Sequence, residues 1–160
     1  MEKNIIISNN ALNSMVNDIK SILNKARENA YASINQNILY SNWQIGRRIV
    51  EEEQNGKERA DYGTQLLKAL SQQLVSDIGK EYNVRNLWYY KQFYLSFPDW
   101  QIVNARVHNL KWTHIRSILR VNDSEARLWY LKEASEQMWS TRTLDRNVAS
   151  QYYYRLLQTS

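Results

Sequence analysis

The amino-acid sequence predicts an all-α fold: a multi-helix domain with a long N-terminal helix and a helix-turn-helix-like unit. Residues that break helices are scarce, with four glycines and one proline among 160 residues, whereas a β-rich chain needs more turn residues. Apolar residues also recur at helical spacing along the chain. Because 43% of the residues are hydrophobic, the chain can bury a single core.

The longest predicted helix begins near Asn10 and continues to about Asn55. Its apolar positions are separated by alternating steps of four and three residues, which is heptad spacing. No glycine or proline interrupts it before Gly46, where a kink could form. Since such a helix extends beyond a small core, we divide the chain into a helical arm, residues 1–25, and a helical domain, residues 26–158. The heptad positions are Leu12, Val16, Ile19, Leu23, Ala26 and Ala30.

This apolar stripe has two interpretations. It can pack within the domain, which is the commoner role of such a stripe. It can instead mediate dimerisation or bind a partner, although heptads that end in alanines give only a weak coiled coil. Because the helix is longer than a domain of this size can cover, we expect the segment from Leu12 to Leu23 to contact a second copy or another domain.

The helix-turn-helix-like unit follows. Leucines at helical spacing mark a second helix that ends near Ile78, and Gly79 is expected to be its left-handed C′ residue. Asn83 can cap a third helix that begins near Val84. Two helices joined by a turn of about five residues match the spacing of a helix-turn-helix unit.

Sorting the third helix at 100° per residue separates an apolar side, which we expect to face the core, from a polar side. The inward set is Leu87, Tyr90, Tyr94 and Phe97; the outward set is Arg85, Tyr89, Gln92 and Ser96; Asn86 and Trp88 lie on the flanks, and Lys91 lies near the core edge.

The rest of the chain is predicted to contain shorter helices. Pro98 ends the third helix, and residues 99–109 are expected to form a loop. A short helix over residues 112–119 follows, and Asn122 or Asp123 caps the next one. Ser140 begins the final helix.

All of the surplus positive charge lies between Lys80 and Asn122. Seven cations and two anions in this window account for the formal net charge of +5. Residues 82–100 also hold eight of the 19 aromatic residues. A basic field interleaved with aromatic rings suits a polyanion, and nucleic acid is the commonest one. The alternative is a solvated basic face beside an aromatic core.

From this window we select eight candidate nucleic-acid-binding residues. Lysine and arginine contact phosphates, while arginine, glutamine and asparagine form bidentate contacts with bases in the major groove. We expect the phosphates of duplex DNA to be contacted by Lys80, Lys91, Arg116 and Arg120. We expect its bases or groove to be contacted by Arg85, Asn86, Tyr89 and Gln92.

No catalytic, metal or cofactor site is expected. The only histidines are His108 and His114, and we expect His114, next to Trp112, to be a hydrogen-bonded packing residue. The chain has no cysteine, so it lacks a disulfide framework and thiolate metal ligands, as is compatible with a cytoplasmic protein. No segment approaches the roughly 20 apolar residues that span a membrane. Trp43, Trp112, Trp129 and Trp139 are expected to anchor the core.

Several motifs, in their order along the chain, resemble the N-terminal domain of YhcG-type proteins. They are residues 43–51, WQIGRRIVE; residues 56–63, GKERADYG; Leu70-Ser71; Arg85-Asn86-Leu87 with Tyr89, Lys91, Phe93 and Tyr94; Trp112-Thr113-His114 with Leu119; Asp123 with Glu125-Ala126-Arg127 and Tyr130-Leu131; and Trp139-Ser140 with Arg142, Leu144 and Arg146. The resemblance spans roughly residues 26–157.

The resemblance implies an all-helical module, which in that bacterial family accompanies a C-terminal PD-(D/E)XK nuclease domain. The catalytic domain would follow Tyr154, so we expect it to be absent from these residues. The expected function is therefore a DNA-binding or targeting module of such a nuclease that does not itself catalyse cleavage. The alternative is a protein-interaction or dimerisation module that uses the long first helix.

Overall fold

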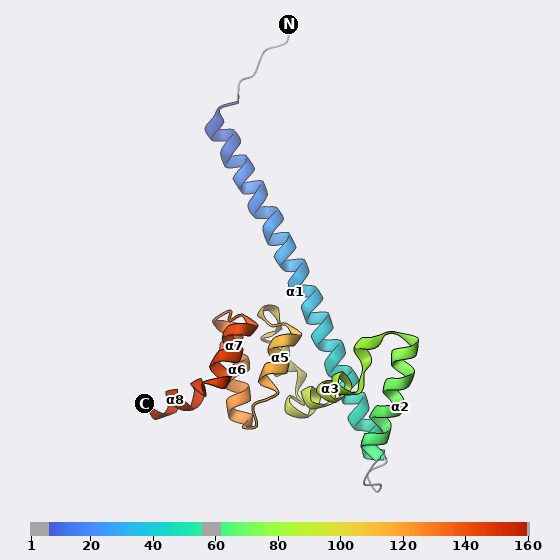
Figure 1. The fold of residues 1–160 in the computed structure, drawn as a ribbon. Coiled ribbons are helices and arrows are strands. Elements are labelled where there is room, and N and C mark those ends of the chain that lie inside the picture. The colour runs from blue at the N-terminus through green and yellow to red at the C-terminus, as the bar shows by residue number, and fades with distance from the viewer. Residues whose placement is uncertain (1–6, 56–61, 160) are drawn as a thin grey trace.

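A computed structural model describes residues 7–55 and 62–159, and it confirms the all-α prediction for them (Figure 1). Helices joined by short loops make up this part of the chain, and no strand occurs in it. The elements in chain order are α1 (Asn9–Asn55), α2 (Tyr62–Asp77), η1 (Lys80–Tyr82), α3 (Val84–Ser96), α4 (Trp100–Asn104), η2 (Val107–Asn109), α5 (Trp112–Ile118), α6 (Ser124–Glu136), α7 (Thr141–Ala149) and α8 (Tyr152–Gln158).

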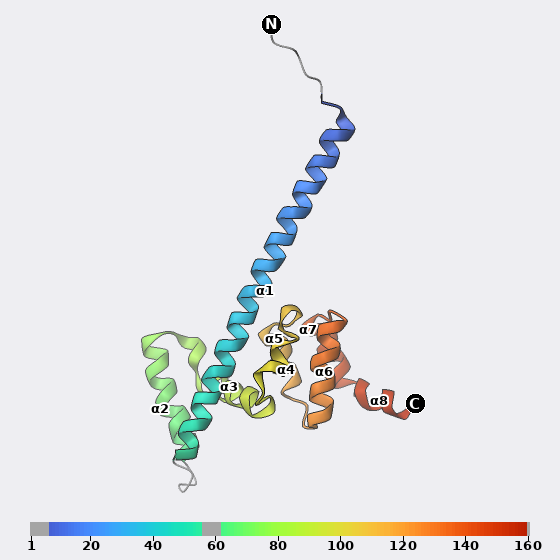
Figure 2. The same ribbon diagram turned by 180° about the vertical axis from the view of Figure 1, so that it is seen from behind.

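Helix α1 is the long N-terminal helix that the sequence predicts, and it has 47 residues. Every residue from Asn9 to Tyr31 is exposed, so the exposed segment extends further than the predicted helical arm, residues 1–25. From here on, the arm means Asn9–Tyr31. Figures 1 and 2 show the arm extending away from the other helices, which gather around the second half of α1. Leu39 is the first buried residue of α1. A single helix thus belongs to both the arm and the body of the molecule.

Gly46 lies at the contact between α1 and α3. Helix α1 continues through this glycine, so the kink that the sequence allows does not interrupt it. A Cβ atom at Gly46 would overlap the backbone carbonyl group of Tyr90 in α3. The backbones of the two helices therefore touch, and glycine is required here because of the close approach.

The buried side chains form two adjacent clusters. The larger one joins α1 to the C-terminal helices, and its residue Trp43 donates a hydrogen bond of 2.8 Å from Nε1 to the carbonyl oxygen of Phe97. The smaller one joins α1, α2 and α3 through Ile49, Leu67 and Leu87. Trp43 is buried, and Trp112, Trp129 and Trp139 pack against the larger cluster, so all four tryptophans belong to the core as expected.

Three predicted helix starts are confirmed by their caps. Asn83 accepts a hydrogen bond from the backbone of Asn86 at the start of α3. Asp123, one of the two residues proposed to cap α6, accepts from the backbone of Glu125. Ser140 caps α7, although α7 ends at Ala149 and a separate helix, α8, follows.

Two loop predictions are wrong. Residues 99–109 contain α4 and η2 because Val103 and Val107 are buried in the core and Asp99 caps α4. Gly79 is not left-handed, since its φ of 162° belongs to extended backbone. The chain leaves α2 in this extended form and makes a 3-10 turn, Lys80–Tyr82, before α3 begins.

His114 is a buried packing residue, as predicted. Its Nδ1 atom accepts a hydrogen bond of 3.0 Å from the backbone N–H of Lys111, so Nε2 carries the proton and donates to the carbonyl oxygen of Trp139 at 2.7 Å. The neutral ring thus caps α5 and ties it to the start of α7. Burial lowers the pKa of His114 below its ordinary value.

We predict that Gly46→Ala destabilises the protein by about 1–3 kcal/mol, because the added methyl group must push α3 away from α1. The control is Gln44→Ala, an exposed position on the same helix, which should stay within about 0.5 kcal/mol of the wild type. Urea unfolding followed by circular dichroism measures both. Equal midpoints for the two variants would show that α1 and α3 can separate without cost.

We also predict that stability falls as the pH decreases below about 6.5, the ordinary histidine pKa. The unfolded chain takes up a proton at residue 114 more readily than the folded chain, because the folded-state pKa is lowered. Unfolding midpoints measured between pH 8 and pH 5 should show this loss in the wild type. The loss should be smaller in His114→Gln and unchanged in His108→Gln, whose ring is exposed.

Candidate nucleic-acid interface

Three of the predicted site residues meet at Tyr89, where α3 lies beside α5. The guanidinium carbon of Arg116 lies 4.6 Å from the centroid of the Tyr89 ring, and that of Arg85 lies 5.8 Å from it. We call Arg85, Tyr89 and Arg116 the Tyr89 cluster. Hydrogen bonding from Arg85 and then Arg116, together with their positive charge, lowers the pKa of Tyr89. Two cations are thus held close together on one aromatic surface.

Aromatic packing positions the two helices that carry the cluster. Trp112 at the start of α5 contacts Tyr90 and Phe93 of α3, with ring centroids 5.3 and 5.5 Å apart. Arg116 follows Trp112 by four residues and therefore lies on the same side of α5. Tyr89 is the residue before Tyr90 on α3. The packing of Tyr90 against Trp112 therefore brings the Tyr89 ring close to Arg116, which lies on the same helix as Trp112. The core contact and the surface cluster are parts of the same helix pairing.

One donor of Arg116 has no partner within the described part of the protein. This donor is the Nε atom, which is buried. A shallow pocket of ≈ 180 Å³ lies beside it and also contains Arg120, Thr113 and Asp145. Asp145 accepts a hydrogen bond from Ser117. Because this Nε atom is buried, a phosphate oxygen could reach Arg116 only through the accessible part of its half-buried side chain.

Trp88 adds an exposed aromatic side chain to this surface. It is 45% exposed and its ring lies edge-on to Tyr89, with centroids 5.2 Å apart. The exposed stripe of α3 therefore runs through Arg85, Trp88 and Leu95, and it is rotated from the predicted outward set. The inward set changes too, because Phe93 is fully buried while Tyr94 is only half-buried.

Two predicted contact residues are engaged within the protein. Lys91 forms an ion pair with Glu53 of α1, with Nζ and Oε2 2.8 Å apart and side-chain exposures of 22% and 16%. Asn86 donates a hydrogen bond of 2.7 Å to the carbonyl oxygen of Glu81 and so holds η1 against α3. Both side chains support the turn and the α1–α3 contact, which leaves them less available to a ligand.

The remaining predicted residues differ in exposure. Lys80 on η1 and Arg120 in the turn after α5 are exposed, and Gln92 on α3 is half-buried. Arg120 follows Arg116 by four residues and shares its pocket. The structure thus brings Arg85 and Tyr89 of α3 close to Arg116 of α5, with Arg120 in the turn that follows α5. The sequence gives one signal for this grouping, the four-residue spacing of Arg116 and Arg120 at the end of the predicted helix.

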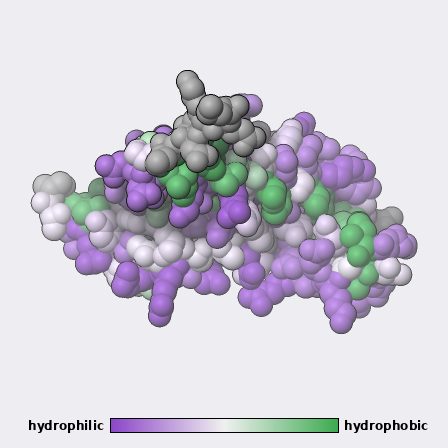
Figure 3. Space-filling view, turned by 90° about the horizontal axis from the view of Figure 1, so that it is seen from above, coloured by the Kyte–Doolittle hydropathy of each residue, from purple (hydrophilic) through white to green (hydrophobic). Residues whose placement is uncertain are grey.

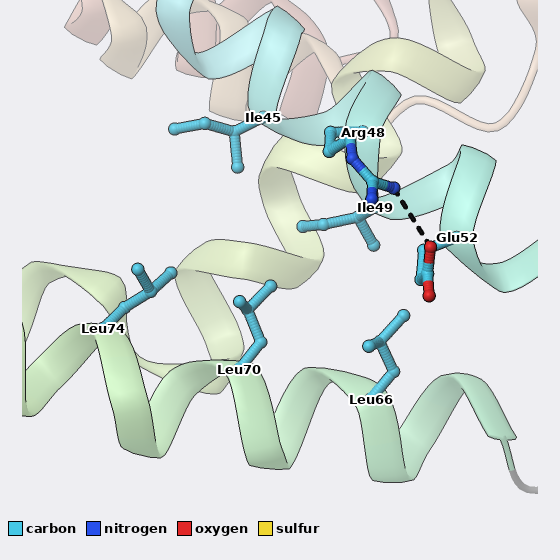
Figure 4. A pocket seen from close by; sticks show the side chains of 7 residues that line it. All are labelled: Ile45, Arg48, Ile49, Glu52, Leu66, Leu70 and Leu74. Atoms are coloured by element: carbon cyan, nitrogen blue, oxygen red, sulfur yellow. Dashed lines mark hydrogen bonds and ion pairs between the residues drawn. The ribbon is translucent and has the colours of Figure 1, made fainter.

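A second cavity lies between α1 and α2 and has a different character. Its volume is ≈ 330 Å³, and Figure 4 shows Ile45 and Ile49 of α1 above Leu66, Leu70 and Leu74 of α2. An ion pair of 3.2 Å between Arg48 and Glu52 lies at its edge. The lining is apolar, so this cavity offers no converging polar groups for a reaction.

Neither a metal-binding group nor a membrane span occurs in the described ranges. Residues 7–55 and 62–159 contain no set of three or more His, Cys, Asp or Glu side chains that could hold a metal ion. Within the same ranges, the helices are too short or too polar to cross a membrane.

Comparisons with known proteins agree with the motifs. The family model of the DUF1016 N-terminal domain matches residues 18–155. The chain is 32% identical over 166 residues to "Putative nuclease YhcG" of Escherichia coli (strain K12), an alignment that covers 85% of this chain and 44% of that protein. The chain therefore spans less than half of that relative's length. No solved structure matches it significantly. The match over most of the described helices shows that the chain belongs to the DUF1016 N-terminal domain family.

Proposed function

We propose that this chain is the DNA-binding or targeting module of a PD-(D/E)XK-type nuclease and that it does not cleave DNA itself. The observation that carries the proposal is the Tyr89 cluster, in which two arginines from separate helices converge on one aromatic ring. The similarity to a protein named as a nuclease supports a role beside DNA. A partner nuclease domain and a cytoplasmic location are parts of the same proposal.

Phosphate recognition is assigned to three cations, Lys80, Arg116 and Arg120. Arg120 and Lys80 are exposed, and the half-buried Arg116 lines the same shallow pocket as Arg120. Cations placed this way neutralise backbone charge on any DNA sequence. Because Lys91 is paired with Glu53, it is left out of this set.

Base or groove contact is assigned to the exposed stripe of α3. Arg85 can form a bidentate contact with guanine in the major groove, and Trp88 offers an exposed ring beside it. In this arrangement α3 is the recognition helix of the predicted helix-turn-helix-like unit, and α2 precedes it. Duplex DNA is the expected ligand.

We predict that duplex binding weakens with salt, with a slope of about −3 in a plot of log affinity against log salt, because the three assigned cations each neutralise a phosphate. Arg116→Ala should weaken binding to every duplex and reduce the slope by about one unit. Fluorescence anisotropy titrations over a range of salt concentrations measure both quantities.

The controls for this prediction are Lys91→Met and Arg27→Ala. Lys91 is paired within the fold and Arg27 is an exposed arginine of the arm, so each variant should keep the wild-type slope. If a folded variant with Arg85, Arg116 and Arg120 all changed to alanine binds DNA as the wild type does, the basic surface is only solvated. The interaction-module interpretation would then replace this proposal.

We also predict that the purified chain does not cleave plasmid or single-stranded DNA in the presence of Mg²⁺ or Mn²⁺. The described residues offer no acidic cluster of the kind that a metal-dependent nuclease uses. Gel analysis after long incubation tests this expectation. Cleavage that disappears when one acidic residue is replaced would contradict it.

A second candidate function is protein interaction through the arm. The specific observation in its favour is a set of large apolar side chains that the arm leaves exposed to solvent. Six of them lie on neighbouring turns of α1: Leu12, Met15, Val16, Ile19, Ile22 and Leu23.

A further inference from the structure

The six apolar side chains of the arm form one continuous face. Each of them is between 39% and 65% exposed. They are separated by steps of three, one, three, three and one residues, which keeps them on one side of a helix over two heptads. No charged residue occupies any of these six positions. We call this surface the arm face. Figure 3, a view from above, shows separate apolar areas surrounded mostly by hydrophilic surface.

The sequence of the arm does not account for a stable isolated helix. Residues 9–30 include six asparagines and two serines, which are weak helix formers in helix interiors. The hydroxyl of Ser8 caps the first turn by accepting from the backbone of Ala11 at 3.1 Å. Beyond that cap, helices in water depend mainly on the packing of an amphipathic face. The arm therefore requires a partner that covers the arm face.

We infer that this partner is the arm of a second copy of the chain, bound in the antiparallel direction. In that alignment Leu12 faces Leu23 of the second copy, Met15 faces Ile22, and Val16 faces Ile19. The face is thus self-complementary about a two-fold axis, as an isologous dimer requires. All six side chains of each arm enter the contact.

A parallel pair fits these residues less well. In a parallel coiled coil, a residue that flanks the apolar seam on one side lies beside a residue of the other helix that is about five positions later in the sequence. Met15 would then lie beside Lys20 of the second copy, and Ile22 would lie beside Arg27. The antiparallel pair removes both apolar side chains from water without placing them against cations. It also keeps the two bodies at opposite ends of the paired arms.

The area of the contact fits a reversible dimer. Covering six half-exposed side chains on each arm removes roughly 80 Å² of apolar surface for each of them. The total for two arms is then about 1,000 Å², which is near the lower limit for a specific protein–protein interface. We therefore expect association that depends on protein concentration. This inference is independent of DNA binding, because the Tyr89 cluster lies on the body and not on the arm.

Cysteine cross-linking tests the direction of pairing, and the natural chain contains no cysteine that could interfere. The doubly substituted chain with Leu12→Cys and Leu23→Cys should oxidise to a covalent dimer, while each single variant should stay mainly monomeric. Within one helix these positions are about 16 Å apart, which is too far for an internal disulfide. Efficient cross-linking of the single variants would overturn the antiparallel arrangement.

Light scattering at several concentrations tests the dimer itself. Wild-type mass should approach twice the chain mass at high concentration, and Ile19→Glu should remain monomeric. The matched control, Asn17→Glu, adds the same charge on the opposite side of the arm and should still dimerise. Both positions are exposed in the monomer, so neither variant should unfold the body. A wild type that stays monomeric at every concentration would overturn the inference, while an unchanged salt slope in Ile19→Glu would leave the DNA-binding proposal standing.

Discussion

The contact between the backbones of α1 and α3 at Gly46 determines the arrangement of the other elements. Because no side chain separates the helices there, Tyr90 and Phe93 of α3 enter the core at a fixed depth. The next residue after Tyr90 is Lys91, which the same approach places against Glu53 of α1. The residue before it, Tyr89, lies on the other side of α3, where α5 supplies Arg116. Tyr89, Tyr90 and Lys91 thus belong, in that order, to the surface cluster, the core and an ion pair.

The basic, aromatic window combines a packed aromatic core with a positively charged surface. Most of its rings are core, since Tyr90, Phe93 and Trp112 pack on one another. The positive surface lies directly over this packing, and Tyr89 and Trp88 reach it from the same helix. A rigid aromatic layer below a set of arginines holds their positions without requiring many salt bridges. This arrangement fits a binding surface better than a flexible charged tail would.

The sequence was sufficient for the helical fold, for the caps at Asn83 and Ser140, and for the packing role of His114, because each depends on local spacing. It could not place Lys91, whose partner Glu53 lies 38 residues away. It also failed for α4 and η2, where burial of Val103 and Val107 overrides a weak local signal. Sorting α3 by angle assumed one buried side, whereas α1 and α2 both contact this helix and Trp112 of α5 packs against two of its rings. That is why the exposed stripe is rotated towards Trp88.

The continuity of α1 from the arm into the body has a geometric consequence. Since the helix turns by about 100° and rises by about 1.5 Å for each residue, the stretch between Tyr31 and Leu39 fixes both the direction of the arm face and its distance from the body. Inserting one residue there would redirect the face by more than a quarter turn. Inserting seven would nearly restore its direction and lengthen the arm by about 10 Å. Length changes within the family at this place should therefore come in multiples of a heptad wherever the arm is used.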